Sequence, residues 1–263
     1  MKRVYEPIAY GLDPIKDCFW TTTVQKQSWP TLDRDLSCDV VIIGAGYTGI
    51  SAAYHLAQDG LDVCLIDAQY PAFGASGRNG GFCCLGGTMA DDRILDHRYG
   101  KDGRRAYHAC EAAAVDLVQS LIGDLHLNVD RHSKGETIMA HRPKDAKSLS
   151  QPDLSCQENY GVSSIYHDQD ELRQLGLHAG FHGARTLPIG FGLNPQKYAY
   201  GLLSAAQSLG LRVFANSPAQ AIDGSTVSAN GHQLKAQKII IATNGYSSED
   251  LVPWMRSRFM PVQ

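Results

Sequence analysis

The sequence predicts an α/β fold with a mostly parallel sheet covered by helices, and three observations support this prediction. Residues 38–43 (CDVVII) are apolar almost throughout, which is typical of a parallel strand buried on both faces. A glycine-rich turn over 44–49 follows, and residues 47–59 place apolar side chains at helical spacing up to Gly60. Residues 61–67 (LDVCLID) are a second apolar run. Strand, helix and strand make one βαβ unit, which predicts a Rossmann-type nucleotide-binding domain.

The rest of the chain also alternates predicted helices and strands, but the apolar runs become shorter in its middle part. Residues 68–90 are glycine-rich and are expected to form a long loop, and 101–123 an alanine-rich helix. From 131 to 185 short apolar runs alternate with polar stretches, which predicts part of a smaller α+β layer. The other expected elements are strands over 136–140, 164–166, 179–182, 211–215 and 238–242, a helix or irregular excursion over 143–160, a helix over 194–209 with Asn194 as N-cap, and a β-meander over 219–222, 226–229 and 233–236.

Composition argues against several classes of function. The 263 residues carry a formal net charge of −3 without a basic stripe, so we expect no nucleic-acid partner. No apolar run approaches the roughly 20 residues of a membrane-spanning helix, and the first residues have no signal-peptide pattern. The 7 cysteines and 10 histidines form no metal-ligand spacing. We therefore expect reduced thiols, no metal site, no membrane span and a cytoplasmic location.

The turn after the first strand carries the pattern GxGxxG. Gly44 permits the tight turn, Gly46 lets the backbone approach a pyrophosphate, and Gly49 lets helix and strand pack closely. The helix N-terminus offers N–H groups and positive potential to phosphates. Asp67, about 20 residues on, would accept hydrogen bonds from a ribose and would repel a 2′-phosphate. The alternative is a chance glycine-rich turn in an α/β protein.

A second glycine-rich segment, Gly74 to Phe82 (GASGRNGGF), lies beyond the second strand. A domain that binds only NAD does not need it, whereas a dinucleotide with an isoalloxazine ring needs backbone close to its ribityl chain. The glycines allow that approach, and Ser76, Arg78 and Asn79 can donate or accept hydrogen bonds. We therefore expect FAD as the cofactor. The alternative is a flexible surface loop.

A third motif, Ile239 to Gly245 (IIIATNG), is an apolar strand ending in small residues that would return beside the dinucleotide, although a plain core strand looks the same. With these motifs in this order, the chain resembles the FAD-dependent oxidoreductases of the D-amino-acid oxidase (DAO) superfamily over about residues 20–263. The stretches DVVIIGAGYTGISAAYHLAQDG, GASGRNGGF, LNPQKYAYGLLSAAQSLG and KIIIATNGYS look most like the γ-glutamylputrescine oxidoreductase subgroup. Glycine and sarcosine oxidases are similar as well.

The resemblance implies a role for each matching residue. Gly44, Gly46, Tyr47, Thr48 and Gly49 would surround the pyrophosphate, Asp67 and Ala68 would hold the adenosine ribose, Ala75, Ser76, Gly80, Gly81 and Phe82 would line the flavin, and Ala219 would contact the adenine side through its backbone. Residues 1–35 are polar and carry Pro7, Pro14 and Pro30, so we expect an irregular arm there. It is followed by a discontinuous FAD-binding domain over 36–130 and 186–258, with part of a substrate domain over 131–185.

The implied reaction is oxidation of the C–N bond of an amine or amino acid to an imine, with a γ-glutamylputrescine-like or glycine- or sarcosine-like substrate. No acid–base side chain stands out, so no catalytic residue is assigned. Family members often have Glu where this chain has Asp67, and they continue past the position of Gln263 into a substrate-binding sheet and a glycine-rich segment. The alternatives are therefore an amine-oxidising flavoenzyme that works alone or is completed by a separate C-terminal half, a non-catalytic fragment that binds FAD weakly or not at all, and a NAD-dependent dehydrogenase.

Overall fold

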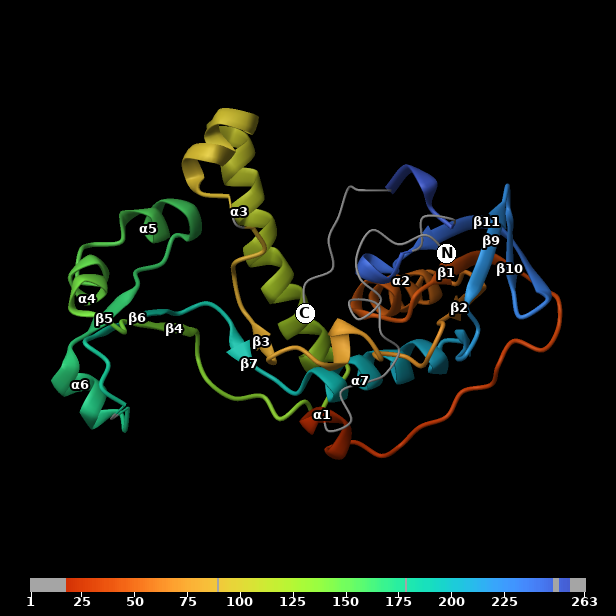
Figure 1. The fold of residues 1–263 in the computed structure, drawn as a ribbon, viewed down its shortest axis with the longest axis horizontal. Helices are drawn as coiled ribbons and strands as arrows, with labels where there is room; N and C mark the ends of the chain where they lie inside the picture. Colours follow the sequence, from red (N-terminus) through yellow and green to blue (C-terminus); the bar gives the residue numbers. More distant parts are fainter. Residues whose placement is uncertain (1–17, 89, 178, 248–250, 256–263) are drawn as a thin grey trace. The chain divides into compact units, whose positions relative to one another are not determined.

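The computed structural model describes residues 18–88, 90–177, 179–247 and 251–255. The chain divides into two compact units, and each is described by itself. Unit 1 comprises residues 1–80, 127–129 and 194–263, and unit 2 comprises residues 81–126 and 130–193. Figure 1 labels their helices and strands.

Unit 1 is built on a six-stranded sheet with the strand order β8–β2–β1–β11–β10–β9. Strands β8, β2, β1 and β11 run parallel to one another, whereas β10 pairs antiparallel with both β11 and β9. The bounds are β1 (Leu36–Ile43), β2 (Val63–Ile66), β8 (Arg212–Phe214), β9 (Ala219–Asp223), β10 (Thr226–Ala229) and β11 (His232–Ile241). This parallel arrangement confirms the predicted α/β class.

Two helices of unit 1 pack against each other beside this sheet, α2 (Tyr47–Gln58) and α7 (Pro195–Ser208). Helix α7 begins as expected, because the side chain of Asn194 accepts a hydrogen bond from the backbone N–H of Lys197 at 3.1 Å. Both helices bury small or apolar side chains, among them Ala53 of α2 and Leu202 of α7. The short elements of unit 1 are α1 (Phe19–Thr22), η2 (Ala75–Gly77), η3 (Asn244–Tyr246) and η4 (Pro253–Met255).

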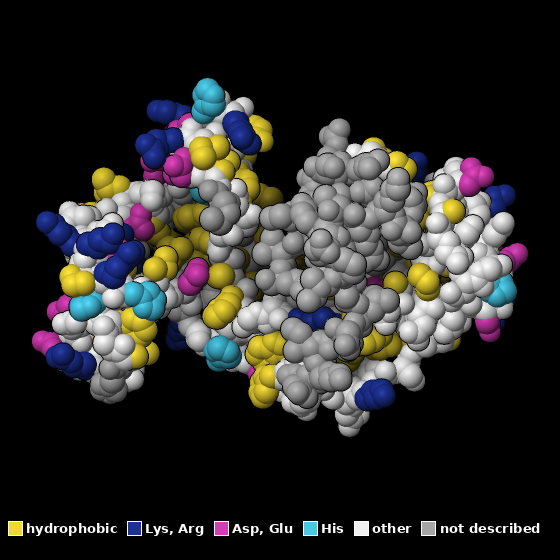
Figure 2. All heavy atoms as spheres, in the orientation of Figure 1, with side chains coloured by type: hydrophobic (Ala, Val, Ile, Leu, Met, Phe, Trp, Pro, Cys, Tyr) yellow, Lys and Arg dark blue, Asp and Glu magenta, His cyan; other side chains and the backbone are white. Residues whose placement is uncertain are grey.

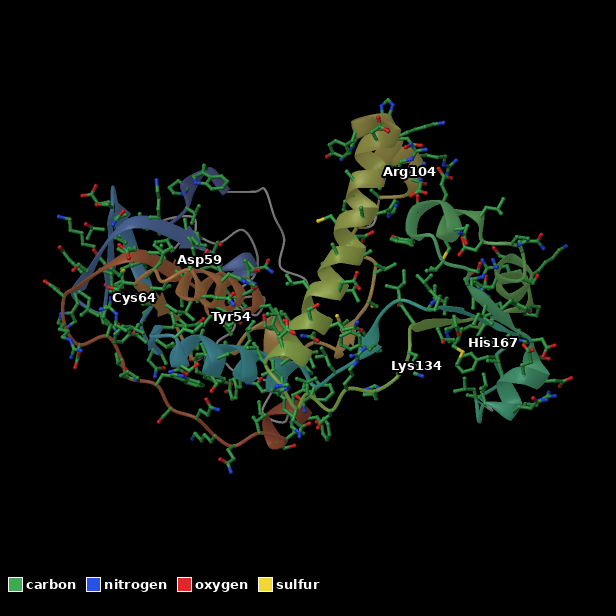
Figure 3. The ribbon with its side chains drawn as sticks, turned by 180° about the vertical axis from the view of Figure 1, so that it is seen from behind. Tyr54, Asp59, Cys64, Arg104, Lys134 and His167 are labelled. Carbon is green, nitrogen blue, oxygen red and sulfur yellow. The ribbon has the colours of Figure 1, made fainter. Side chains whose placement is uncertain are left out.

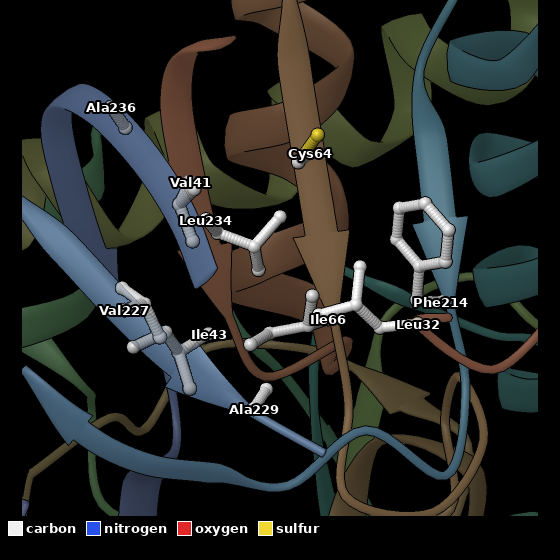
Figure 4. Close-up of a cluster of buried hydrophobic side chains, with 10 residues drawn as sticks. All are labelled: Leu32, Val41, Ile43, Cys64, Ile66, Phe214, Val227, Ala229, Leu234 and Ala236. Atoms are coloured by element: carbon white, nitrogen blue, oxygen red, sulfur yellow. The ribbon is translucent and has the colours of Figure 1, made fainter. Parts of the chain in front are cut away.

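A hydrophobic core lies on one face of the sheet of unit 1 (Figure 4). Alternate residues of neighbouring strands point into it because side chains alternate between the two faces of a strand. Its members are Leu32, Val41, Ile43, Cys64, Ile66, Phe214, Val227, Ala229, Leu234 and Ala236. Each large aliphatic side chain buried here contributes about 1.5–3 kcal/mol, so the strands hold the turns at their ends in a defined place.

Unit 2 combines one long helix with two small antiparallel sheets. Helix α3 (Asp92–Asp124) contains Gly100 at φ 72° and ψ 170°, so the helix is interrupted there and its second part confirms the helix predicted over 101–123. One sheet has the order β4–β6–β5, and the other is the ribbon β3–β7. The remaining bounds are β3 (Phe82–Cys83), β4 (Glu136–Met139), α4 (Pro143–Leu149), α5 (Leu154–Tyr160), β5 (Ile165–His167), α6 (Gln169–Gln174), β6 (Ala184–Leu187) and β7 (Phe191–Gly192).

Acidic and basic side chains are interspersed over the visible face of unit 2 (Figure 2). Within the described part of the chain, no helix has both the length and the apolar character that crossing a bilayer requires. All 7 cysteines have free thiols in this structure.

Several elements differ from the sequence-based predictions. The strands predicted separately over 233–236 and 238–242 are one strand, β11, because its residues from 234 to 241 pair with β1 while those from 232 to 235 pair with β10. The strand predicted over 179–182 is wrong, and the strand lies at Ala184–Leu187 instead. Gly180 and Gly183 have φ of 74° and 155°, which breaks an extended run at this point.

Three segments that were predicted to be wholly or partly irregular contain regular elements. Residues 143–160 form the two helices α4 and α5, the glycine-rich loop over 68–90 contains η2 and β3, and the N-terminal arm contains α1. The compact units also group residues 81–126 with 130–193, whereas the predicted domain boundary falls at 130. The compact units are defined by packing, whereas the predicted domains were defined by FAD binding and substrate binding. The predicted FAD-binding domain over 36–130 and 186–258 and the substrate domain over 131–185 therefore stay predictions.

Candidate nucleotide-binding site

The glycine-rich turn lies where the parallel strands of unit 1 end. The backbone N–H of Gly44 donates to the carbonyl of Ile66 at 2.8 Å, and that of Ala242 donates to the carbonyl of Ile43 at 2.8 Å. The carboxyl ends of β1, β2 and β11 therefore meet at one edge of the sheet. In open α/β sheets, ligands bind at this edge. The fold thus brings the first and third sequence motifs together.

Each glycine of the first motif has a steric reason to lack a side chain. Gly44 has φ 103°, and a Cβ there would come within 2.6 Å of the carbonyl oxygen of Ala242. A Cβ on Gly49 would overlap the carbonyl oxygen of Gly44, where α2 passes the end of β1. A Cβ on Gly46 would come within 3.0 Å of the hydroxyl of Ser76. The turn is thus a close-packed structure, as the motif predicts.

Asp67 follows β2 and binds the glycine-rich turn directly. Its Oδ2 accepts a hydrogen bond from the backbone N–H of Ala45 at 2.7 Å, and its Oδ1 accepts one from Gln69 at 2.8 Å. Burial raises the pKa of Asp67, and these two hydrogen bonds offset part of that effect. Each carboxylate oxygen has a second lone pair that can accept from a ribose hydroxyl.

Residues 216–219 return to the same place from a distant part of the sequence. The backbone N–H of Ser217 donates to the carbonyl of Asp67 at 2.7 Å, and that of Asn216 donates to the carbonyl of Gln69 at 2.6 Å. Ala219 begins β9 two residues later. Ala219 is therefore two residues from Ser217, which contacts Asp67. Ala68, the residue after Asp67, is exposed.

The glycine-rich segment after β2 packs against the N-terminus of α2. The Ser76 hydroxyl accepts a hydrogen bond from the backbone N–H of Tyr47 at 2.9 Å. Gly46 is the N-cap of α2 and has no side chain, so Ser76 supplies a capping oxygen from another segment. The Tyr47 hydroxyl donates to the carbonyl of Pro195 at 3.2 Å and links α2 to α7. Thr48 is exposed in the same turn of the helix.

Residues outside the predicted set hold this segment in place. The indole N–H of Trp20, on α1, donates to the carbonyl of Asn79 at 2.8 Å. The side chain of Asn79 turns back to the carbonyls of Ala75 and Ser76, each at 3.1 Å. A Cβ on Gly77 would overlap the buried side chain of Gln196. No sequence motif indicated Trp20 or Gln196, because each acts through contacts made across the fold.

Arg78 provides the test of whether this site fits an anionic cofactor. Its guanidinium lies over the ring of Phe73, 4.2 Å from the ring centroid. The Nη2 atom is buried and has no hydrogen-bond partner among the described residues. A buried donor of a charged group without an acceptor is costly, and it is expected where an anionic ligand supplies the acceptor. Such a donor fits an anionic group such as a phosphate.

The last predicted cofactor residues span the boundary between the units. Gly80 ends the first segment of unit 1, and Gly81 and Phe82 belong to unit 2. The carbonyl of Gly81 accepts a hydrogen bond from the backbone N–H of Leu193 at 2.9 Å. Phe82 pairs with Gly192 in the β3–β7 ribbon, and its side chain is 78% exposed.

The fold and this turn define a dinucleotide-binding α/β protein. Residues 39–263 match the family DAO, described as FAD dependent oxidoreductase, and the chain belongs to this family. It is 29% identical over 235 residues to gamma-glutamylputrescine oxidoreductase of Escherichia coli K12, with 88% of this chain and 54% of that protein covered.

Two further comparisons agree with this family. The chain is 27% identical over 242 residues to the probable oxidoreductase OrdL of Haemophilus influenzae, with 88% of this chain and 54% of that protein covered. Glycine oxidase from Bacillus cereus ATCC 14579 has a similar fold, with a TM-score of 0.63 at 19% identity and 85% of this chain and 59% of that chain covered. The chain thus spans about half the length of the curated relatives it matches.

Proposed function

We propose that the chain binds FAD in unit 1 and forms part of a flavoenzyme that oxidises the C–N bond of an amine or amino acid. The observation that carries this proposal is the buried, unpartnered Nη2 of Arg78, in the segment whose Ser76 caps α2. Membership of the FAD dependent oxidoreductase family supports it. NAD remains the weaker candidate, because the segment Gly74 to Phe82 is superfluous for it.

Different residues of the site would bind different parts of FAD. The first turn of α2 and Arg78 would hold the pyrophosphate, and Asp67 would accept hydrogen bonds from the ribose. Ala75, Asn79 and Gly80 would approach the ribityl chain. Bound FAD supplies the redox chemistry, in which a hydride equivalent leaves the carbon beside the substrate nitrogen and the imine product hydrolyses. The protein supplies position and electrostatics.

A γ-glutamylated amine is the first substrate to try, because the relative at 29% identity is named for oxidising one. Glycine is the second, because a glycine oxidase shares the fold. The amine must lose its proton before hydride transfer, so activity is expected to rise with pH across the pKa of the amine.

The test is a visible absorption spectrum of the purified chain before and after addition of FAD. Resolved flavin bands that remain after gel filtration would support the proposal, and bleaching by an amine under anaerobic conditions would extend it to catalysis. Bound flavin that no amine bleaches would favour a non-catalytic FAD-binding fragment. A chain that takes up no FAD would contradict the proposal, and retention of NAD instead would favour a dehydrogenase.

A further inference from the structure

The backbone on both sides of Arg78 is held by donors from the short helix α1 and its N-cap. The indole N–H of Trp20 donates to the carbonyl of Asn79 at 2.8 Å. The thiol of Cys18, the N-cap residue of α1, donates to the carbonyl of Gly77 at 3.6 Å. Gly77 and Asn79 are the chain neighbours of Arg78, so one short stretch of chain restrains the backbone directly before and directly after it.

Helix α1 is itself anchored within unit 1. It packs against α7, and Figure 3 draws the side chains of both helices as sticks. The side chain of Asn194, the N-cap of α7, donates to the Thr23 hydroxyl at 2.8 Å, and that hydroxyl donates to the carbonyl of Trp20 at 2.6 Å. Asn194 is 1% exposed, so this link is shielded from competing water. The position of the Trp20 indole is therefore set by the start of α7.

Close packing restrains the same segment as well. A Cβ on Gly77 would overlap the carbonyl oxygen of Ala72 and the side chain of Gln196, so the backbone of Gly77 lies against both. The Ser76 hydroxyl caps α2. Packing thus limits movement of the segment toward these neighbours, and the bonds from α1 hold it at Gly77 and Asn79.

Arg78 needs such a restraint because its side chain is held at an energetic cost. Its guanidinium lies over the ring of Phe73, and its buried Nη2 has no hydrogen-bond partner among the described residues. A buried charged donor without an acceptor favours any movement that lets water reach it. Backbone that is fixed on both sides of Arg78 opposes this movement, so the donor stays in place for an anionic ligand.

We propose that Trp20 is a positioning residue, whose hydrogen bond to Asn79 keeps the guanidinium of Arg78 in place for a phosphate of FAD. This inference rests on the proposed function for the identity of the ligand. Trp20 itself touches no cofactor in this scheme and acts through Arg78. Its contribution to binding is that the cation is ordered before the ligand arrives, which lowers the cost of ordering it on binding.

A double-mutant cycle tests whether Trp20 acts through Arg78. Trp20→Phe keeps an aromatic ring and removes the donor to Asn79, and it is expected to weaken FAD binding about fivefold, the scale of one lost hydrogen bond. In a chain that carries Arg78→Met, the same change should weaken binding less than about twofold, because the cation it positions is gone. FAD titration of the four chains, followed by fluorescence, measures the cycle. Equal losses in both backgrounds, or no loss in either, would overturn the proposal.

Trp29→Phe is the matched control for the change of Trp20. Trp29 belongs to the same unit, and its ring packs against that of Tyr200 with 5.5 Å between the centroids. The control variant should bind FAD as the wild type does. A loss of affinity equal to that of Trp20→Phe would show a general effect of trimming an indole and would contradict a specific role of Trp20.

Amide hydrogen exchange on the chain without FAD tests the restraint by itself. The N–H groups of Gly77 and Arg78 donate to the carbonyls of Gly74 and Ala75 within the segment, each at 3.2 Å. Trp20→Phe should speed exchange at these two amides about fivefold, because the segment opens more often once its bond to α1 is lost. Trp29→Phe should leave both rates unchanged. Wild-type exchange rates in Trp20→Phe would overturn the restraint.

A second variant covers the case in which Trp20→Phe does not fold. Cys18→Ala removes the thiol donor to Gly77 and little volume, and it should speed exchange at the same two amides by about twofold, because a thiol is a weak donor. Unchanged rates in Cys18→Ala would then overturn the restraint. If the wild type binds no FAD, the proposed function fails together with the role in flavin binding, and the exchange experiment still decides whether α1 restrains Arg78.

Discussion

Gly49 lies where helix α2 passes the end of β1, and a side chain does not fit there. We expect Gly49→Ala to destabilise unit 1 by about 1–3 kcal/mol, because an added methyl would overlap the carbonyl of Gly44 and force the backbone to move. FAD binding should weaken with it. Urea unfolding followed by circular dichroism measures the change. Gly123→Ala is the control, since a Cβ on this helical glycine of α3 meets nothing within 4 Å and should be neutral or slightly stabilising.

Arg78 has a buried Nη2 without a partner among the described residues, so its charge should matter more for binding than for folding. We expect Arg78→Met to weaken FAD binding about tenfold or more while leaving the free energy of unfolding unchanged or slightly raised. Fluorescence titration with FAD and urea unfolding would measure the two effects. Arg131→Met is the control, because Arg131 also stacks on a ring at 4.2 Å, that of Phe191, but its Nη2 donates to Gln119 at 2.7 Å. Equal losses of FAD affinity would contradict a role for Arg78 in binding.

At the scale of elements, α3 and α5 are joined by buried charged groups, so their packing should depend on pH. Burial tends to raise the pKa of Glu111, but hydrogen bonds from Gly87, Tyr160, His108 and Tyr107 outweigh it and leave the pKa below its ordinary value of 4.5. The pKa of Asp92 is also lowered, since Asn159 and His108 outweigh the effect of burial. A carboxylate with a lowered pKa in the folded state stabilises the protein above its ordinary pKa.

We therefore expect unit 2 to keep this stabilisation above about pH 4.5 and to lose it as the pH falls through the lowered pKa values. Amide exchange over α3 and α5 between pH 3 and 7, corrected for the intrinsic rate, would measure it. E111Q should show a smaller dependence on pH, whereas the raised pKa of Asp67 acts in unit 1 and in the opposite direction. The same pH dependence in E111Q and wild type would show that Glu111 is not the responsible group.

At the scale of the whole molecule, a ligand bound only by the folded state should stabilise the unit that contains its site. With FAD at 100 times its Kd, unit 1 should gain about 2.7 kcal/mol. The measurement is thermal unfolding with and without FAD, followed by limited proteolysis to identify the protected unit. We expect protection of unit 1. Protection confined to residues 130–193 would contradict the proposed site.

Much of unit 1 could be predicted because its signals are local. The apolar runs of β1 and β2, the glycines between them and the cap at Asn194 each depend on a few neighbouring residues. Unit 2 was harder to predict because its strands are short and partly exposed. The wrong strand over 179–182 illustrates this, since Ala179 and Phe181 suited a strand, whereas Gly180 within the segment and Gly183 after it did not.

The sequence by itself determined the class of fold, the place of the glycine-rich turn and the family, because periodicity and glycine spacing are local properties of the sequence. Only the tertiary structure showed that Ser76 caps α2, that Asp67 binds the turn at Ala45, that Arg78 has a donor without a partner and that Glu111 anchors Gly86 and Gly87. These contacts join residues far apart in the sequence or depend on burial. Their existence depends on how strands and helices pack, which no local pattern specifies.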